Sequence, residues 1–296
     1  MKKYKTNALY AKELRQSVRS IKFPITVGLY CFTLAVIGLF TLVAISTSGY
    51  SIYNAYTIKQ DFIVFYSILF GLEFGLALFA VPALTGGTIS VERDHGTLEM
   101  LLITELGTKR IILGKLLSSI SKLMLYVFSG LPVLALIFTF GGASIGDLGK
   151  YILLIILMSL YIGSFGILMS TIFRKTSTAM AVSYIWVMFI TLGTIFIAFV
   201  SNVFSSVNND SLNPIFLLNP VVTMFSLLDA QIGLPDVIGN YINFQKQSGF
   251  VMENWFALSL FVQAVITVIN ISVANYFLNP FRNKRSRRSV KTSLEV

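Results

Sequence analysis

Six long apolar runs dominate the pattern of hydrophobic and polar positions along this 296-residue chain. Because a helix of about 20 apolar residues covers the roughly 30 Å hydrocarbon core of a bilayer, each run predicts a membrane-spanning helix. The expected spans are 25–46, 62–84, 111–140, 151–173, 178–203 and 255–278. The third run is longer than a bilayer requires, so we expect its helix to begin in water. The pattern predicts an all-α membrane protein with six transmembrane helices, in one domain over residues 1–296.

The first 23 residues predict an amphipathic helix at the membrane surface. Basic side chains recur there, and apolar residues return at helical spacing at Leu9, Tyr10, Leu14, Val18 and Ile21. A helix with one apolar and one basic face lies in the interface between lipid and water. A basic flank that only orients the first span is the simpler alternative.

A shorter apolar segment, 215–228, precedes the last span. It has too few residues to cross the membrane as a helix, and Asn219 and Pro220 interrupt it. Irregular backbone at membrane depth has to be buried within protein. We therefore expect this segment to lie in the outer interface or to re-enter the membrane from outside, without forming a seventh span.

Basic residues are distributed unevenly between the two sides that six spans define. With a cytoplasmic N-terminus, all but Lys59, Lys150 and Lys246 fall on the cytoplasmic side. The cytoplasmic set comprises Lys2, Lys3, Lys5, Lys12, Arg15, Arg19 and Lys22, then Arg93, Lys109, Arg110, Lys115 and Lys122, then Arg174 and Lys175, and Arg282, Lys284, Arg285, Arg287, Arg288 and Lys291 in the tail at 279–296. Cytoplasmic loops carry such an excess. We therefore expect a multi-pass protein of the cell membrane with both termini in the cytoplasm.

Composition favours a lipid environment and limits the chemistry. Hydrophobic residues make up 55% of the chain and charged residues 12%, against about a quarter in soluble domains. The single cysteine, Cys31, excludes an intrachain disulfide. The net charge is +10, but the basic residues flank spans without forming a stripe with interleaved aromatic residues. An anionic lipid surface or an acidic partner therefore fits better than nucleic acid.

Glu73 is an acidic residue well inside an apolar run. A carboxyl group at that depth is costly unless it is paired, protonated or hydrated, so we expect it to face the protein interior. Gly71 and Gly75 flank it in a G-x-x-x-G arrangement that lets another helix approach closely. Two interpretations stay open: a residue of a transport pathway, and a structural hydrogen bond between helices.

The stretch 89–117, ISVERDHGTLEMLLITELGTKRIILGKLL, interrupts the apolar sequence between the second and third spans. Thr97 is suited to cap a helix that carries Leu98, Met100, Leu101 and Leu102, and Thr108 is suited to cap the next one. The spacing predicts a short amphipathic helix between two turns. Its charged residues place it in water or against a partner protein.

Within this stretch, E-R-D-x-G-T-L-E-x-L-L at 92–102, followed by G-K-L-L at 114–117, resembles the signature of the permease subunits of ABC-2 type transporters. The family often carries a proline where this chain has Glu105. Residues 12–23 resemble the N-terminal connecting helix of the same family less closely. In that family the loop is a coupling helix that rests on a separate ATPase subunit, and two permease domains, identical or homologous, pair around a central path.

The resemblance implies a contact with the ATPase. Its expected residues are Glu92, Arg93, Asp94, Gly96, Thr97, Leu98, Glu99, Leu101, Leu102, Lys109 and Arg110. We expect the apolar face to supply most of the binding and the charges to fix the register.

Motifs for catalysis are missing from the sequence. No G-x-x-x-x-G-K-[ST] occurs, so we expect this chain not to hydrolyse ATP, and we expect ATP and Mg²⁺ to be bound by the partner ATPase. The single histidine, His95, excludes a histidine pair for zinc. We expect neither an enzyme activity nor a cofactor in this chain.

Three functions are compatible with these features. The first is the permease subunit of an ATP-driven ABC-2 exporter that moves an amphipathic substrate such as a drug, a lipid-like molecule or a peptide. The second is an ion-coupled carrier that uses Glu73. The third is a membrane anchor or assembly protein without transport. The first interpretation requires a partner ATPase, which separates it from the other two.

Overall fold

The computed structural model describes residues 8–47, 55–103, 107–139, 145–197, 200, 214–232 and 254–279. Every regular element in these ranges is a helix, and six are long and apolar enough to cross a membrane, as predicted. They are α2 (Lys22–Thr47), α3 (Ala55–Thr85), α6 (Thr108–Thr139), α7 (Ile145–Ile172), α8 (Thr176–Met188) with its π-helical continuation η1 (Phe189–Gly193), and α13 (Trp255–Leu278). The predicted basic tail beyond Asn279 lies outside the described residues.

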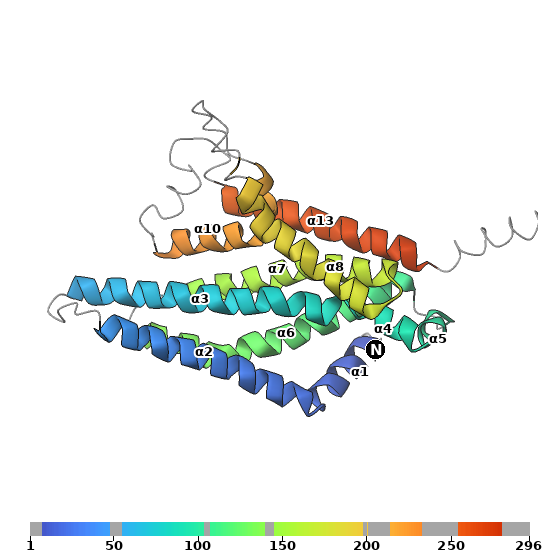
Figure 1. The fold of residues 1–296 in the computed structure, drawn as a ribbon, viewed down its shortest axis with the longest axis horizontal. Coiled ribbons are helices and arrows are strands. Elements are labelled where there is room, and N and C mark those ends of the chain that lie inside the picture. Colours follow the sequence, from blue (N-terminus) through green and yellow to red (C-terminus); the bar gives the residue numbers. More distant parts are fainter. Residues whose placement is uncertain are drawn as a thin grey trace, which may run out of the picture.

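The long helices lie side by side along one axis (Figure 1). α7 contacts α3, α6, α8 and α13 and therefore occupies the middle of the bundle. Two short helices, α4 (Ser90–Asp94) and α5 (Leu98–Ile103), lie at the end of the bundle where α3 ends and α8 begins (Figure 1). The stretch that the sequence singled out is therefore ordered at one end of the molecule.

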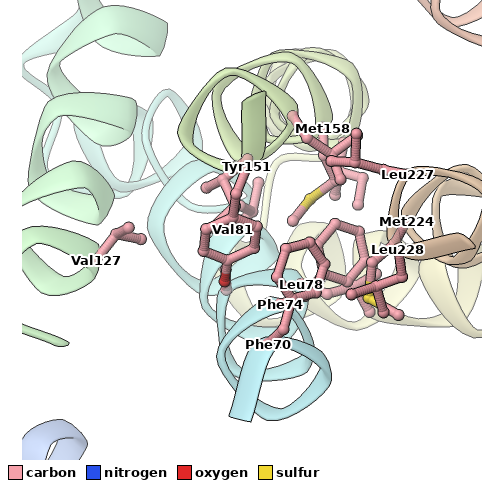
Figure 2. Close-up of a cluster of buried hydrophobic side chains, with 14 of the residues drawn as sticks. Phe70, Phe74, Leu78, Val81, Val127, Tyr151, Met158, Met224, Leu227 and Leu228 are labelled. Carbon is pink, nitrogen blue, oxygen red and sulfur yellow. The ribbon is translucent and has the colours of Figure 1, made fainter. Parts of the chain in front are cut away.

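Buried aromatic and aliphatic side chains, most of them from α3 and α7, form the main core (Figure 2). The rings of Phe70 and Tyr151 lie 4.0 Å apart between their centroids. Large apolar side chains on the outer faces, such as Phe40 and Phe261, are exposed. Exposed apolar side chains of this kind are suited to contact with lipid, because lipid is the solvent for the outside of a membrane bundle.

The helix expected near the N-terminus is α1 (Ala8–Val18), which ends before the first long helix begins. It packs against α6, and the hydroxyl groups of Tyr10 and Ser121 are 3.0 Å apart. The chain turns after Val18 and continues as α2, so that α1 and α2 enclose an angle in Figure 1.

The segment before the last span contains a 3₁₀ helix, η2 (Pro214–Leu218), and α10 (Pro220–Ile232). α10 runs beside the long helices and contacts α3, α7 and α13 (Figure 1). Asn219, fully buried between η2 and α10, donates to Thr191 O at 3.1 Å and to Thr194 Oγ1 at 2.7 Å. Thr191 lies in the π-helical η1, so a side chain between η2 and α10 is bonded to the irregular part of the fifth span.

Candidate functional site

α4 and α5 form a helical pair between the second and third spans. The amphipathic helix predicted after Thr97 is α5, whereas α4, formed by the charged residues before it, was not predicted. Gly96 connects the two with φ of +69°, in the left-handed region where a Cβ is unfavourable. The Thr97 amide donates to Glu92 O at 2.9 Å, and the Thr97 hydroxyl donates to the Glu92 carboxylate. These bonds fix the turn between α4 and α5.

Glu92 also connects α4 to α6. Its carboxylate forms an ion pair with Lys115 at 3.3 Å, and the Lys115 side chain is only 4% exposed. A buried ammonium group requires a partner of opposite charge, and Glu92 supplies one. Sequence reasoning did not place Lys115 in the site. The sequence did carry a signal: Lys115 lies inside the third apolar run, 111–140, with mainly apolar residues around it.

Arg93 and Asp94 connect α4 to the turn between α7 and α8. The Arg93 guanidinium donates to Thr171 O at 2.9 Å and to Phe173 O at 3.2 Å, at the end of α7. Asp94 Oδ2 accepts the Thr176 amide at 3.3 Å and the Thr176 hydroxyl, at the start of α8. The hydroxyl hydrogen bond holds the pKa of the Asp94 carboxyl below its usual range. The Arg and Asp side chains therefore contact helix ends of the same chain.

The backbone between α3 and α4 is held by α7. The hydroxyl oxygen of Ser170, which is fully buried, accepts the amides of Ile89 at 2.8 Å and Ser90 at 2.9 Å. A Cβ on Gly166 would collide with Thr85 Oγ1 and would lie 3.3 Å from the amide nitrogen of Gly86. The sequence signal was the recurrence of small residues at helical spacing along α7, which was not used.

The apolar positions of α5 divide between core and surface. Leu98 is buried in a cluster with Ile112, Leu116 and Leu278, and Leu102 packs against this cluster. Met100 is 76% exposed and Glu99 is exposed beside it. The side chain of Leu101 lies outside the described residues. Leu98 and Leu102, predicted to face a partner, thus contact this chain's own core.

The remaining predicted positions lie at the start of α6. Lys109 and Arg110 are exposed in its first turn. Thr108, predicted as a helix cap, is the first residue of α6, and its hydroxyl donates to Asn275 Oδ1 of α13 at 2.6 Å. α6 and α13 are therefore joined beside the α4–α5 pair.

Glu73 forms a second polar site, inside the bundle. The side chain is fully buried and faces the interior, and its carboxyl group accepts the hydroxyls of Tyr30 from α2 and Tyr151 from α7, each at 3.1 Å. A Cβ on Gly130 of α6 would be 3.0 Å from Glu73 Oε1, so the absence of a side chain there makes room for the carboxyl group. Gly71 and Gly75 have open space where a Cβ would stand. The carboxyl group connects three helices.

Comparison with protein families decides what kind of protein this is. The family model of ABC-2 family transporter proteins matches residues 7–277. The chain belongs to the ABC-2 transporter family. No curated protein matches its sequence significantly.

As an ABC-2 family member, the chain is a multi-pass membrane component of a transporter. Membrane components of this family typically lack ATPase motifs and generally pair with ATPase subunits. Within the described ranges, His, Cys, Asp and Glu side chains form no group of three that could hold a metal ion.

Proposed function

We propose that this ABC-2 protein is the permease subunit of an ATP-driven exporter, that α5 and the start of α6 contact a separate ATPase subunit, and that α4 joins this contact to the spans. The supporting observation is the fixed position of the pair: hydrogen bonds and an ion pair join it to α6, α7 and α8. A force applied to such an element reaches three spans. The ATPase binds ATP and Mg²⁺, and a second permease domain completes the transport path.

The surface offered to the ATPase consists of exposed residues of α5 and the start of α6. Met100 is an exposed apolar residue of α5, and Glu99, Lys109 and Arg110 supply charge near it in the sequence. An exposed apolar side chain within a charged rim is the usual anatomy of a protein contact. Leu98 and Leu102 contribute by holding α5 against the permease core.

The segment formed by η2 and α10 re-enters the membrane from the outer side. α10 has 13 residues, which as a helix is about 20 Å long and too short to cross a bilayer. It nevertheless packs along spans, and buried polar side chains satisfy the backbone of η2, which precedes it: Tyr161 donates to Leu218 O at 3.2 Å and Gln263 to Leu217 O at 3.4 Å. Irregular backbone within a membrane requires such partners.

The cargo is an amphipathic molecule moved outward. Support comes from the aromatic content, 25 Phe and 13 Tyr, which suits a path for molecules with apolar and polar parts. Drugs, lipid-like molecules and peptides share this chemistry.

The proposal is tested by isolating the tagged full-length chain from its native membrane with the ATPase that co-purifies with it. Met100→Asp and Glu99→Arg should reduce the retained ATPase by about tenfold, the loss expected for a central residue of an interface. Gly96→Pro should uncouple ATP hydrolysis from export, because proline cannot adopt the positive φ of this turn.

The matched control is Glu99→Gln, which removes the charge without reversing it and should retain most of the ATPase. Absence of any ATPase from the purified wild-type chain would support the membrane-anchor alternative. Transport that follows an ion gradient and persists without an ATPase would support the carrier.

A further inference from the structure

We infer that Arg93 and Asp94 are positioning residues that fasten α4 to the ends of α7 and α8, so that these helices move together with the coupling element. The inference rests on the proposed function. It assigns the two side chains a role inside the permease, and the ATPase contact then belongs to their neighbours on α5 and α6. The contacts of Arg93 and Asp94 with Thr171, Phe173 and Thr176 are named the α4 clamp.

The order of charges in the α4 clamp matches the helix ends that it holds. The last carbonyls of α7 have no amide partners within their helix and carry partial negative charge, which the Arg93 guanidinium neutralises with two hydrogen bonds. The first amides of α8 carry partial positive charge, and Asp94 accepts one of them. Two adjacent residues of α4 thus bind two helix ends of opposite polarity.

The α7–α8 connection is short enough for both ends to be held at once. α7 ends at Ile172 and α8 begins at Thr176, so three residues separate the helices. A helix end held by a side chain on a neighbouring element cannot shift independently of that element without losing the hydrogen bonds. Displacement of α4 is therefore passed to the start of α8 as well as to the end of α7.

Other contacts connect α4 to α3, α6 and α7 but not to α8. Ser170 bonds the amides at the start of α4 to α7, and the Glu92–Lys115 ion pair bonds α4 to α6. α3 is joined to α4 by the backbone. Among the described hydrogen bonds of α4, those that Asp94 accepts from Thr176 reach α8. Removing them should release α8 selectively.

The experiment uses the full-length chain in complex with its co-purified ATPase, with Cys31 replaced by Ser and spin labels at two introduced cysteines. Ile185→Cys on α8 and Phe32→Cys on α2 are both at exposed positions. Electron paramagnetic resonance measures the distance between the labels before and after addition of ATP and vanadate. We expect an ATP-dependent shift in the wild-type background and its loss in Asp94→Ala.

A second label pair reports motion that does not depend on the α4 clamp. Phe79→Cys on α3 and Val268→Cys on α13 are at exposed positions, and α3 is continuous with α4 through the backbone. This shift should persist in Asp94→Ala. Asp94→Asn, which keeps the acceptor oxygen, should restore the α8 shift. The melting temperature and the retained ATPase should be unchanged in both variants, which separates positioning from a folding defect.

A double-mutant comparison separates an internal contact from a contact with the ATPase. If Asp94 acts through Thr176, the double variant Asp94→Ala/Thr176→Ala should lose no more of the α8 shift than the more severe single variant. The reason is that both substitutions remove the same hydrogen bond, from the Thr176 hydroxyl to Asp94. Additive losses, or an α8 shift retained in Asp94→Ala, would overturn the inference. If the wild-type complex shows no ATP-dependent shift for either label pair, the proposed ATP-driven coupling is wrong. The role inferred for the α4 clamp, which rests on that coupling, is then wrong as well.

Discussion

Gly166 and Thr85 show how single residues set the distance between the second and fourth spans. The Thr85 hydroxyl, which is almost fully buried, donates to Val81 O at 2.8 Å within its own helix. Gly166 faces it, and the backbone of α7 approaches the amide of Gly86 closely because no side chain separates them. The closeness of this crossing brings Ser170 within reach of the amides at the start of α4.

Replacing Gly166 with Ala should therefore destabilise the protein although it favours the helix. The added methyl group would meet Thr85 Oγ1, and overpacking of this kind costs about 1–3 kcal/mol. Thermal unfolding in detergent should show a lower midpoint for Gly166→Ala. Gly75→Ala is the matched control, because a Cβ there meets open space, and its midpoint should not fall. Adding Thr85→Ala to Gly166→Ala should recover part of the loss.

The helices α2, α3 and α7 are connected by hydrogen bonds to Glu73, which lies beside an apolar core. Glu73 accepts one hydroxyl from α2 and one from α7, and Tyr126 of α6 stacks on Phe23 of α2 with ring centroids 5.6 Å apart. α2 has large exposed apolar side chains along its outer face, so few contacts hold it. The Tyr30–Glu73 hydrogen bond is therefore important for the position of α2.

Substitutions of Glu73 distinguish its two interpretations. Glu73→Ala leaves the buried Tyr151 hydroxyl and the partly buried Tyr30 hydroxyl without this acceptor, at a cost of up to about 1–3 kcal/mol for each group. Glu73→Gln keeps an acceptor for one tyrosine and adds a donor for the other, so its thermal midpoint should stay close to wild type. If Glu73 is structural, export by Glu73→Gln should also remain. Loss of export at normal stability would instead identify a protonatable residue of a transport pathway.

Across the whole molecule, basic residues gather at the end of the bundle that carries α4 and α5. Lys109, Arg110, Arg174 and Lys175 lie at helix ends there, whereas Lys150 lies in the first turns of α7 at the opposite end (Figure 1). The excess of basic residues on one side fixes the orientation of a membrane protein. The α4–α5 end should therefore lie in the cytoplasm, where ATP is available.

Labelling of single cysteines tests this orientation. In a Cys31→Ser background, Met100→Cys should react with a membrane-impermeant maleimide in inside-out vesicles stripped of the ATPase subunit, and should stay unreacted in intact cells. Lys150→Cys should show the opposite pattern, because its side chain is 63% exposed at the other end. Reaction of Met100→Cys in intact cells would place the coupling element outside and contradict the proposed function.

Several features followed from the order of residues alone. The six long apolar runs appear as six long helices because in lipid a backbone has to satisfy its own hydrogen bonds, and a long apolar run can do so only as a helix. Helix starts after Thr97 and near Thr108 were predicted, and α5 begins at Leu98 and α6 at Thr108. The two threonine hydroxyls, however, donate to Glu92 and Asn275 instead of accepting helix-end amides. The interior position of Glu73 followed from the cost of a carboxyl group in lipid.

The partners of the polar residues were decided by the tertiary structure. Arg93 lies 80 positions from Phe173, and Glu73 lies 43 from Tyr30 and 78 from Tyr151, so no local pattern pairs them. Leu98 and Leu102 were expected to face a partner, yet they pack against α6 and α13, because helical spacing shows which residues share a face but not what covers it. Sequence determined where this chain crosses the membrane, because that depends on local hydrophobicity. Contacts between distant segments determined which charges join the helices and which remain exposed.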